Sequence, residues 1–280
     1  MTKAKRTKGS RLMSSFSRYP AGSRVPVGIL LSLAFFVRAT CLAQNPCIWA
    51  GGNGNWFPTG TQQSNWFGIV AGGRVSCIPT NGVTADIGNA SGTGSLNGTV
   101  TLNGPVNLEG VVLGSGGSGT LIVSSSQNTL EANTLFIGNS SSGTLTVQNG
   151  GMATSTYVNI GAGAGANGNV TVTGTGSVLN ATDPSGYFVV GNIGQGTLTI
   201  SNGGRVNSVN PVIASSQGSN GSVTVTGAGS QWNNSNGMGL QSNGVLTISN
   251  GGVVNNLGGI FMGGGTDRCR QRLAMEYRVY

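Results

Sequence analysis

Residues 137–180 read IGNSSSGTLTVQNGGMATSTYVNIGAGAGANGNVTVTGTGSVLN, and residues 190–233 repeat the pattern as VGNIGQGTLTISNGGRVNSVNPVIASSQGSNGSVTVTGAGSQWN. One five-residue motif recurs within and around them, at intervals of 21, 24, 25, 28, 25 and 23 residues. Its seven copies are GTVTL, GTLIV, GTLTV, GNVTV, GTLTI, GSVTV and GVLTI, which begin at Gly98, Gly119, Gly143, Gly168, Gly196, Gly221 and Gly244. A repeat of this length is typical of solenoids, whose units stack because none can bury its apolar face alone.

Apolar residues alternate with threonine within the motif, as at Leu145 and Val147. A period of two predicts a strand with its apolar side chains on one face. Such strands, stacked about 4.8 Å apart, share a continuous interior. The intervening NGG segments supply Asn and Gly, which accept the positive φ angles of tight corners at the least cost. We therefore predict an all-β fold, a right-handed parallel β-helix of about seven coils over residues 96–265. The alternative is a disordered chain rich in Gly, Ser and Asn, but disorder does not require this alternation.

The composition excludes several kinds of chemistry. The chain has 280 residues with 51 Gly, 7% charged residues and no His. Without His there is no Ser/His/Asp or Cys/His catalysis, no HExxH zinc site and no imidazole pH switch. The glycines follow no G-x-y period, which excludes collagen. We predict no catalytic residue, no cofactor and no metal site.

The N-terminus carries an export signal. Residues 1–24 contain seven basic residues and no acid, and the apolar run VPVGILLSLAFFV follows at 25–37. That run is shorter than the roughly 20 residues a membrane-spanning helix needs, so it reads as the core of a signal peptide over residues 1–43, cleaved after Ala43. A lipoprotein anchor at Cys41 is the alternative, which Arg38 disfavours. The predicted location is extracellular or the outer-membrane surface.

The net charge of +8 comes from the N-terminal residues. Residues 1–43 hold eight basic residues and no acid, whereas residues 44–265 hold two arginines and four acids. The basic balance thus belongs to the signal peptide. We predict that nucleic acid is not a partner.

The segment 44–95 is expected to cap the first coil. Cys47 and Cys77 are predicted to form a disulfide, as export to an oxidising compartment would permit, with a reduced pair as the alternative. Trp49, Trp56 and Trp66 are expected to plug the end of the helix and protect its edge. A carbohydrate-stacking platform made of the same three rings is the other possibility.

Carboxylates are scarce in the repeats. Glu109 in NLEG and Glu131 in TLEA occupy similar places one coil apart, so stacking could bring them within one rung, close to the roughly 5 Å of a retaining glycosidase pair. Many β-helices act on polysaccharides, and such an enzyme is the runner-up function. However, the repeats contain no Lys or His and only Arg205 as a base. We interpret the pair as a solvated corner or weak cation site and predict that the protein is not an enzyme.

Threonines recur at matching positions of the motif. One column is expected to run through Thr101, Thr146, Thr171, Thr199, Thr224 and Thr247, with Ile122 interrupting it. Such columns resemble the T-x-T arrays of ice-binding solenoids, a remote alternative function. The simpler interpretation is that β-branched Thr suits an exposed strand position.

The alternating units quoted above resemble the type V secretion and PEP-CTERM-associated repeats of bacterial autotransporter passenger proteins, from Gly98 to about Gly265. The preceding segment, with GNW at Trp56, NW at Trp66 and ADIGN from Ala85, is similar to such passengers too. The resemblance implies a secreted or surface-displayed β-helical stalk with a structural or adhesive role and no catalytic residues. Expected partners are a host or bacterial surface, matrix or glycan. Contact with a membrane is expected only through a C-terminal barrel or anchor, which we expect to be missing.

The last residues, 266–280, depart from the repeat. TDRCRQRLAMEYRVY carries six charges in 15 residues, and Cys269 has no evident role. A truncated or frame-shifted reading frame would explain this charged tail. A polar capping helix that closes the open end of the solenoid is the alternative.

Overall fold

The computed structural model describes residues 46–60, 64–70, 73–90, 97–263 and 272–275. All of them belong to the compact unit Cys41–Tyr280. The predicted signal peptide and Cys269 lie outside the described residues.

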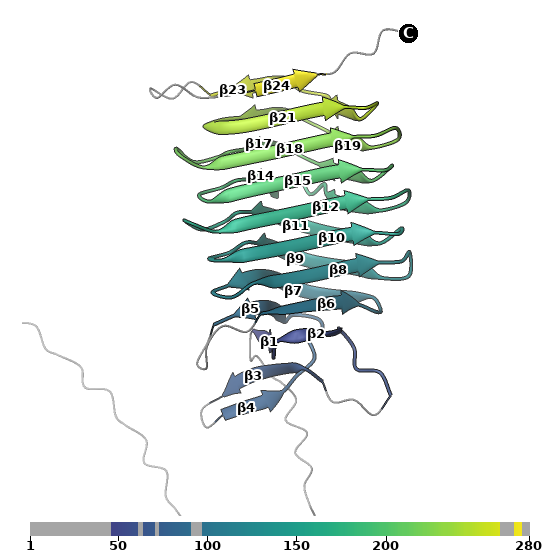
Figure 1. Cartoon of the computed structure of the whole chain (residues 1–280), viewed down its shortest axis with the longest axis vertical. Helices are drawn as coiled ribbons and strands as arrows, with labels where there is room; N and C mark the ends of the chain where they lie inside the picture. Colours follow the sequence, from purple (N-terminus) through teal and green to yellow (C-terminus); the bar gives the residue numbers. More distant parts are fainter. Residues whose placement is uncertain (1–45, 61–63, 71–72, 91–96, 264–271, 276–280) are drawn as a thin grey trace, which may run out of the picture. The chain divides into compact units, whose positions relative to one another are not determined.

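Every regular element that the structure describes is a β-strand, and the strands form two sheets (Figure 1). The repeated motif builds the nine-stranded sheet. This sheet contains, in order, β2 (Gly52–Asn55), β6 (Gly98–Leu102), β8 (Gly119–Ser124), β10 (Ser142–Gln148), β12 (Asn167–Thr173), β15 (Gln195–Ser201), β18 (Asn220–Thr226), β21 (Asn243–Ser249) and β24 (Arg272–Met275).

The rest of each coil belongs to the fifteen-stranded sheet, which bends. Its early coils carry single long strands, β5 (Thr84–Asn89), β7 (Val106–Ser115), β9 (Thr129–Ile137) and β11 (Met152–Ile160). Later coils carry two short strands each: β13 (Val178–Ala181) and β14 (Tyr187–Val190), β16 (Arg205–Ser208) and β17 (Pro211–Ile213), β19 (Gln231–Asn234) and β20 (Met238–Leu240), and β22 (Val253–Asn256) and β23 (Ile260–Met262). Because β11 pairs with both β13 and β14, the sheet turns a corner within one strand, and each coil has three sides.

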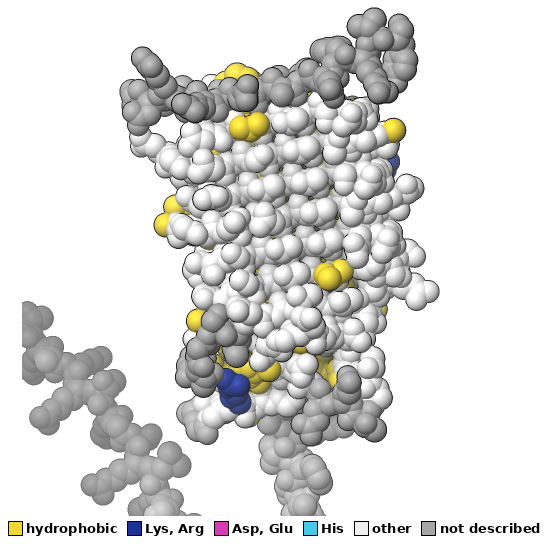
Figure 2. Space-filling view, in the orientation of Figure 1, with side chains coloured by type: hydrophobic (Ala, Val, Ile, Leu, Met, Phe, Trp, Pro, Cys, Tyr) yellow, Lys and Arg dark blue, Asp and Glu magenta, His cyan; other side chains and the backbone are white. Residues whose placement is uncertain are grey.

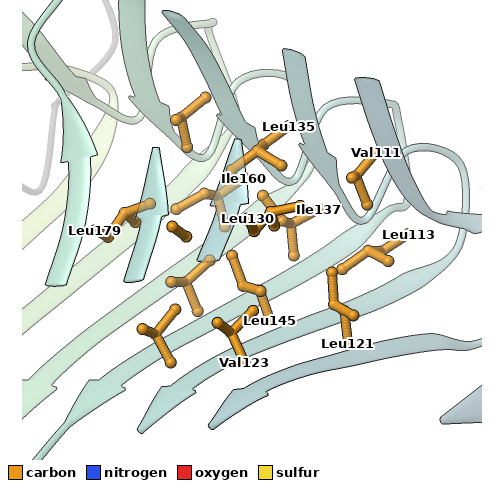
Figure 3. Packing of buried hydrophobic residues seen from close by; sticks show 14 of the residues in the cluster. Val111, Leu113, Leu121, Val123, Leu130, Leu135, Ile137, Leu145, Ile160 and Leu179 are labelled. Carbon is orange, nitrogen blue, oxygen red and sulfur yellow. The ribbon is translucent and has the colours of Figure 1, made fainter. Parts of the chain in front are cut away.

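The motif strands pair in parallel, with their first glycines aligned from Gly98 to Gly244. Alternate apolar side chains such as Leu145 and Val147 are fully buried. Figure 3 shows side chains from both sheets, including Leu113 and Leu121, meeting in the interior. In Figure 1 the chain rises one rung each time it runs left to right in front and returns behind, which is right-handed. The predicted right-handed parallel β-helix of about seven coils is confirmed.

The corners use the residues that the sequence suggests. Asn149, Asn202 and Asn250 of the NGG segments have φ angles of 51°, 52° and 50°. Close packing explains the glycine that opens each motif. A Cβ on Gly143 would lie 2.1 Å from the backbone nitrogen of Gly138, closer than any real contact. The coil therefore closes only when this position has no side chain.

The N-terminal segment is continuous with the solenoid. β1 (Cys47–Trp49) pairs in parallel with β5, and β2 pairs in parallel with β6. β3 (Trp66–Val70) and β4 (Gly73–Ser76) form an antiparallel hairpin that is paired to β1. The predicted cap thus contributes the first rung as well as the closure.

The C-terminal end differs from the alternative of a capping helix. Residues 272–275 form β24, which pairs in parallel with β21 and places Leu273 opposite Leu246. The backbone here continues the nine-stranded sheet, so the helix is wrong for these residues, while 264–271 lie outside the described part. In the same region Phe261 of β23 is 67% exposed.

Candidate functional site

The cysteines and tryptophans of the N-terminal segment lie inside the molecule. Cys47 and Cys77 form a disulfide. Trp49, Trp56 and Trp66 are 0%, 0% and 1% exposed. Their ring centroids lie 5.0 Å apart for Trp49 and Trp66 and 4.7 Å apart for Trp56 and Trp66. A carbohydrate-stacking platform on these rings is wrong, because no ring presents a face to a ligand; they fill the first coil.

Three of the four carboxylates in residues 44–265 line one groove of about 620 Å³ on the outside of the fifteen-stranded sheet. They are Glu109 on β7, Glu131 on β9 and Asp183 in the loop between β13 and β14. The remaining lining is mostly amide and hydroxyl side chains, and none of the described lining residues is basic. The groove is the site at which the few charges of the helix gather.

The two glutamates are offset rather than paired. Glu131 lies in register with Asn107, whose Nδ2 donates a hydrogen bond to Glu131 Oε2 at 3.2 Å. In the neighbouring column Asn133 Nδ2 donates to Glu109 Oε1 at 3.2 Å. The expected stacking of Glu109 over Glu131 is therefore wrong: each carboxylate faces an amide, and the two stand diagonally across the groove.

Asp183 closes the end of the groove from an inserted loop. Its Oδ1 accepts hydrogen bonds from the hydroxyl of Ser185 at 2.7 Å and from the backbone N–H of Ser185 at 2.8 Å. These donors lower the pKa of Asp183 below its ordinary value. Its Oδ2 lies 3.5 Å from the hydroxyl of Thr156, at the bend of β11. Asp183 is thus held as a carboxylate beside the other two.

The column that contains Glu131 continues along the helix as a ladder of amides. Asn207 donates to Asn180 at 2.7 Å, Asn233 to Asn207 at 2.9 Å, and Asn255 to Asn233 at 2.8 Å. Within the ladder, each neighbouring pair of amides is thus joined by one hydrogen bond.

Two tyrosines lie just beyond the groove, around the bend. Tyr157 of β11 and Tyr187 of β14 are in register, and their ring centroids lie 5.0 Å apart. Tyr187 is 37% exposed. Two residues after Tyr157, Asn159 is only 5% exposed, and its Oδ1 accepts no hydrogen bond. Val158 between them points into the core, so strand alternation places both residues on the outer side.

The tyrosine pair was not predicted from the sequence. A signal was present, since the interval from Gly168 to Gly196 is the longest in the repeat. The extra residues lie in the loop 182–186, which holds Asp183 and leads directly into Tyr187. Insertions in solenoid repeats form loops on one face, often the binding face.

The fourth carboxylate, Asp86, lies apart from the groove. It is 5% exposed on β5, and Asn89 donates a hydrogen bond to its Oδ2. Burial, which disfavours the charged form, raises the pKa of Asp86, and hydrogen bonds from Asn89 and Ser115 oppose this only in part. Its other oxygen, Oδ1, has no partner.

The outer face of the nine-stranded sheet is much plainer. Its described side chains are almost all uncoloured in Figure 2, and no acidic side chain is visible there. The strand registers align the central column that the sequence predicted: Thr101, Ile122, Thr146, Thr171, Thr199, Thr224 and Thr247. This face is a regular surface of hydroxyls and methyls.

Within the described ranges, no cluster of three or more His, Cys, Asp or Glu side chains is arranged to hold a metal ion. None of the described segments is an apolar helix of membrane-spanning length.

A scan against protein-family models found no match to this chain. Searches of curated proteins and of solved structures likewise found no significant match.

Proposed function

We propose that the protein is exported and acts outside the cytoplasm as a structural and adhesive β-helix of the autotransporter-passenger type, without chemistry of its own. One observation carries this proposal. Seven coils stack in strict register around an apolar interior, and the polar groups able to make contacts lie outside it. A stack of this kind is a rigid support that displays side chains over a long surface.

Two features support export. The N-terminal basic residues and the apolar run at 25–37 have the layout of a secretory signal. The Cys47–Cys77 disulfide suits an oxidising compartment outside the cytoplasm.

The arrangement of the carboxylates favours binding over hydrolysis. Glycoside hydrolysis needs two carboxyl groups that face each other across the scissile bond. Here Glu109 and Glu131 stand diagonally, and each accepts a hydrogen bond from its own asparagine. Such amide-held carboxylates are suited to orienting ligand hydroxyl groups.

Export is tested by expressing the full chain in a Gram-negative host and fractionating the cells. We expect a shortened chain outside the cytoplasm in which Cys47 and Cys77 resist thiol alkylation until reduced. A full-length cytoplasmic chain whose thiols react at once would contradict the proposal.

Adhesion is tested with beads coated with the exported chain, applied to bacterial cells, epithelial layers and extracellular matrix. We expect retention on at least one surface and no release of reducing sugar from pectins or related glycans. Release of sugar that the double variant Glu109→Gln/Glu131→Gln abolishes would establish the polysaccharide-active alternative instead.

The aligned threonines favour one second candidate, ice binding by the nine-stranded face. The column of hydroxyls is regular, although Ile122 interrupts it. Thermal hysteresis of the purified chain decides this candidate: a freezing gap that Thr171→Leu reduces supports it, and no gap removes it.

A further inference from the structure

We infer that the groove and the neighbouring tyrosine pair form one binding site for an uncharged glycan. This inference deepens the proposed adhesive function and rests on it. Its components are a polar groove, a partly exposed aromatic pair just around the bend from it, and a buried acceptor without a partner beside that pair.

The groove supplies hydrogen-bond acceptors that the protein does not use. Glu109 Oε1 and Glu131 Oε2 each accept one hydrogen bond from an asparagine, and their other oxygens accept none from described residues. Sugar hydroxyl groups are donors, and a carboxylate accepts from them more strongly than a neutral group does. The groove therefore offers directed contacts to a polyhydroxylated ligand.

The tyrosine pair supplies the apolar contact that a sugar also needs. Tyr157 and Tyr187 stand on consecutive coils, with ring planes tilted by 47°. Tyr187 is 37% exposed and Tyr157 is partly exposed, so both rings keep surface that a ligand can cover. They offer a large, rigid contact area with a polar hydroxyl at the tip, suited to the apolar face of a pyranose.

The inserted loop joins the two parts. It packs tightly on the bend, since a Cβ on Gly186 would lie 1.9 Å from the carbonyl oxygen of Thr156. One end of the loop places Asp183 in the groove, and the other leads into Tyr187. A ligand lying along the groove therefore meets the tyrosines at the end where the loop closes it.

Asn159 is an independent indication that the outer surface beside Tyr157 contacts a ligand. It is flanked in register by Phe136 and Val189, and its Oδ1 has no hydrogen-bond partner although the side chain is buried. Buried acceptors are almost always satisfied, and exceptions call for an explanation. A donor from a ligand that displaces the surrounding side chains would satisfy it.

Charge decides which glycan class fits. Three carboxylates line the groove, and no described lining residue is basic. The negative charges of uronic acids and of sulfated or sialylated sugars would be repelled by these carboxylates, and no described lining residue offers a positive charge to offset this. Neutral hexose and N-acetylhexosamine chains supply hydroxyl and amide donors without that repulsion.

The test is an array of immobilised neutral, N-acetylated, sulfated and uronic-acid oligosaccharides probed with the exported full chain. We expect binding to members of the uncharged classes, and titration calorimetry with those members to show affinity at least about ten-fold weaker for Tyr157→Ala/Tyr187→Ala. Glu131→Gln keeps the shape of the groove but removes one of its three negative charges. It should weaken binding of uncharged chains and reduce the discrimination against uronic-acid chains. The matched control Thr171→Ala/Thr199→Ala, on the nine-stranded face, should bind as the native chain does.

Three outcomes would overturn the inference: no binding to any uncharged glycan, preference for acidic glycans, or native affinity in the folded tyrosine variant. Circular dichroism of each variant confirms that it is folded before binding is compared. If the array is negative while coated beads still adhere to cells, the glycan site is refuted and the adhesive proposal stands. If neither binds, both fall.

Discussion

The two sheets of this β-helix are built from the same coils, yet their outer faces differ. The nine-stranded sheet repeats one motif, and its outward columns are threonine, serine and asparagine at nearly every coil. The fifteen-stranded sheet carries the groove, the inserted loop and the tyrosine pair at one place only. Packing requires the regular part of the coil to repeat, whereas a single-copy feature is not needed for stacking. We therefore propose that the part of the fifteen-stranded sheet that carries these single-copy features is the functional surface.

The largest effect should come from the glycine that opens each motif. We expect Gly143→Ala to lower the free energy of unfolding by more than about 3 kcal/mol, because the new methyl group would collide with backbone of the preceding corner. Urea denaturation measures the loss. Ser142→Ala, at the adjacent exposed position, should change stability by less than about 0.5 kcal/mol. Equal losses of stability in the two variants would show that the close backbone contact at Gly143 does not limit which residue fits there.

A loss of similar size is expected inside the fifteen-stranded sheet. Trp232 is fully buried, and its indole N–H donates to the hydroxyl of Ser208 at 2.9 Å. Trp232→Ala should cost about 3–5 kcal/mol through the cavity it leaves. Trp232→Phe retains most of the volume but leaves the hydroxyl without its donor, so it should cost less. Thermal unfolding of the two variants gives the order, and a more harmful Phe variant would contradict it.

The two aspartates should give opposite pH dependences. The raised pKa of Asp86 means that the folded chain holds its proton more tightly than the unfolded chain. Its contribution to stability is therefore lost as pH rises from the ordinary value of 3.8 through its folded pKa. The lowered pKa of Asp183 has the reverse sign, and its contribution is lost as pH falls below 3.8 through its folded pKa.

Denaturation curves at a series of pH values separate the two groups. Asp86→Asn should reduce the fall in the free energy of unfolding as pH rises above 3.8. Asp183→Asn should reduce the fall in the free energy of unfolding as pH drops below 3.8, and this effect should be the smaller one because Asp183 is exposed. If the Asp86→Asn variant still loses stability above pH 3.8 as the native chain does, another titrating group is responsible for that loss.

The repeated part of the fold was predictable because all seven copies of the motif show the same alternation and a similar spacing. Alternation at Leu145 and Val147 defined the buried face, and spacing defined the coils. The C-terminal strand was not predicted, since the RLAM of residues 272–275 lacks the glycine and threonine of the motif. Its backbone nevertheless pairs with β21, because an unpaired strand edge favours any segment able to extend beside it.

The candidate site was predictable only in part. Glu109 and Glu131 were singled out, but aligning the LE pairs of NLEG and TLEA gave the wrong register. The turn before β9 is longer than that before β7, so Leu130 lies opposite Val106 rather than Leu108. Tyr157 and Tyr187 lie 30 residues apart, at the start of YVNIG and YFVVG, and the register of β11 with β14 brings them together.

We propose that contact is made by the groove and the tyrosine pair of the fifteen-stranded sheet and not by the threonine face. The direct measurement compares the adhesion of beads coated with the native chain, with Tyr157→Ala/Tyr187→Ala, or with Thr171→Ala/Thr199→Ala, each shown to be folded. We predict that the tyrosine variant loses most of its adhesion, about ten-fold or more, while the threonine variant retains that of the native chain. Retained adhesion in the tyrosine variant together with loss in the threonine variant would contradict the claim.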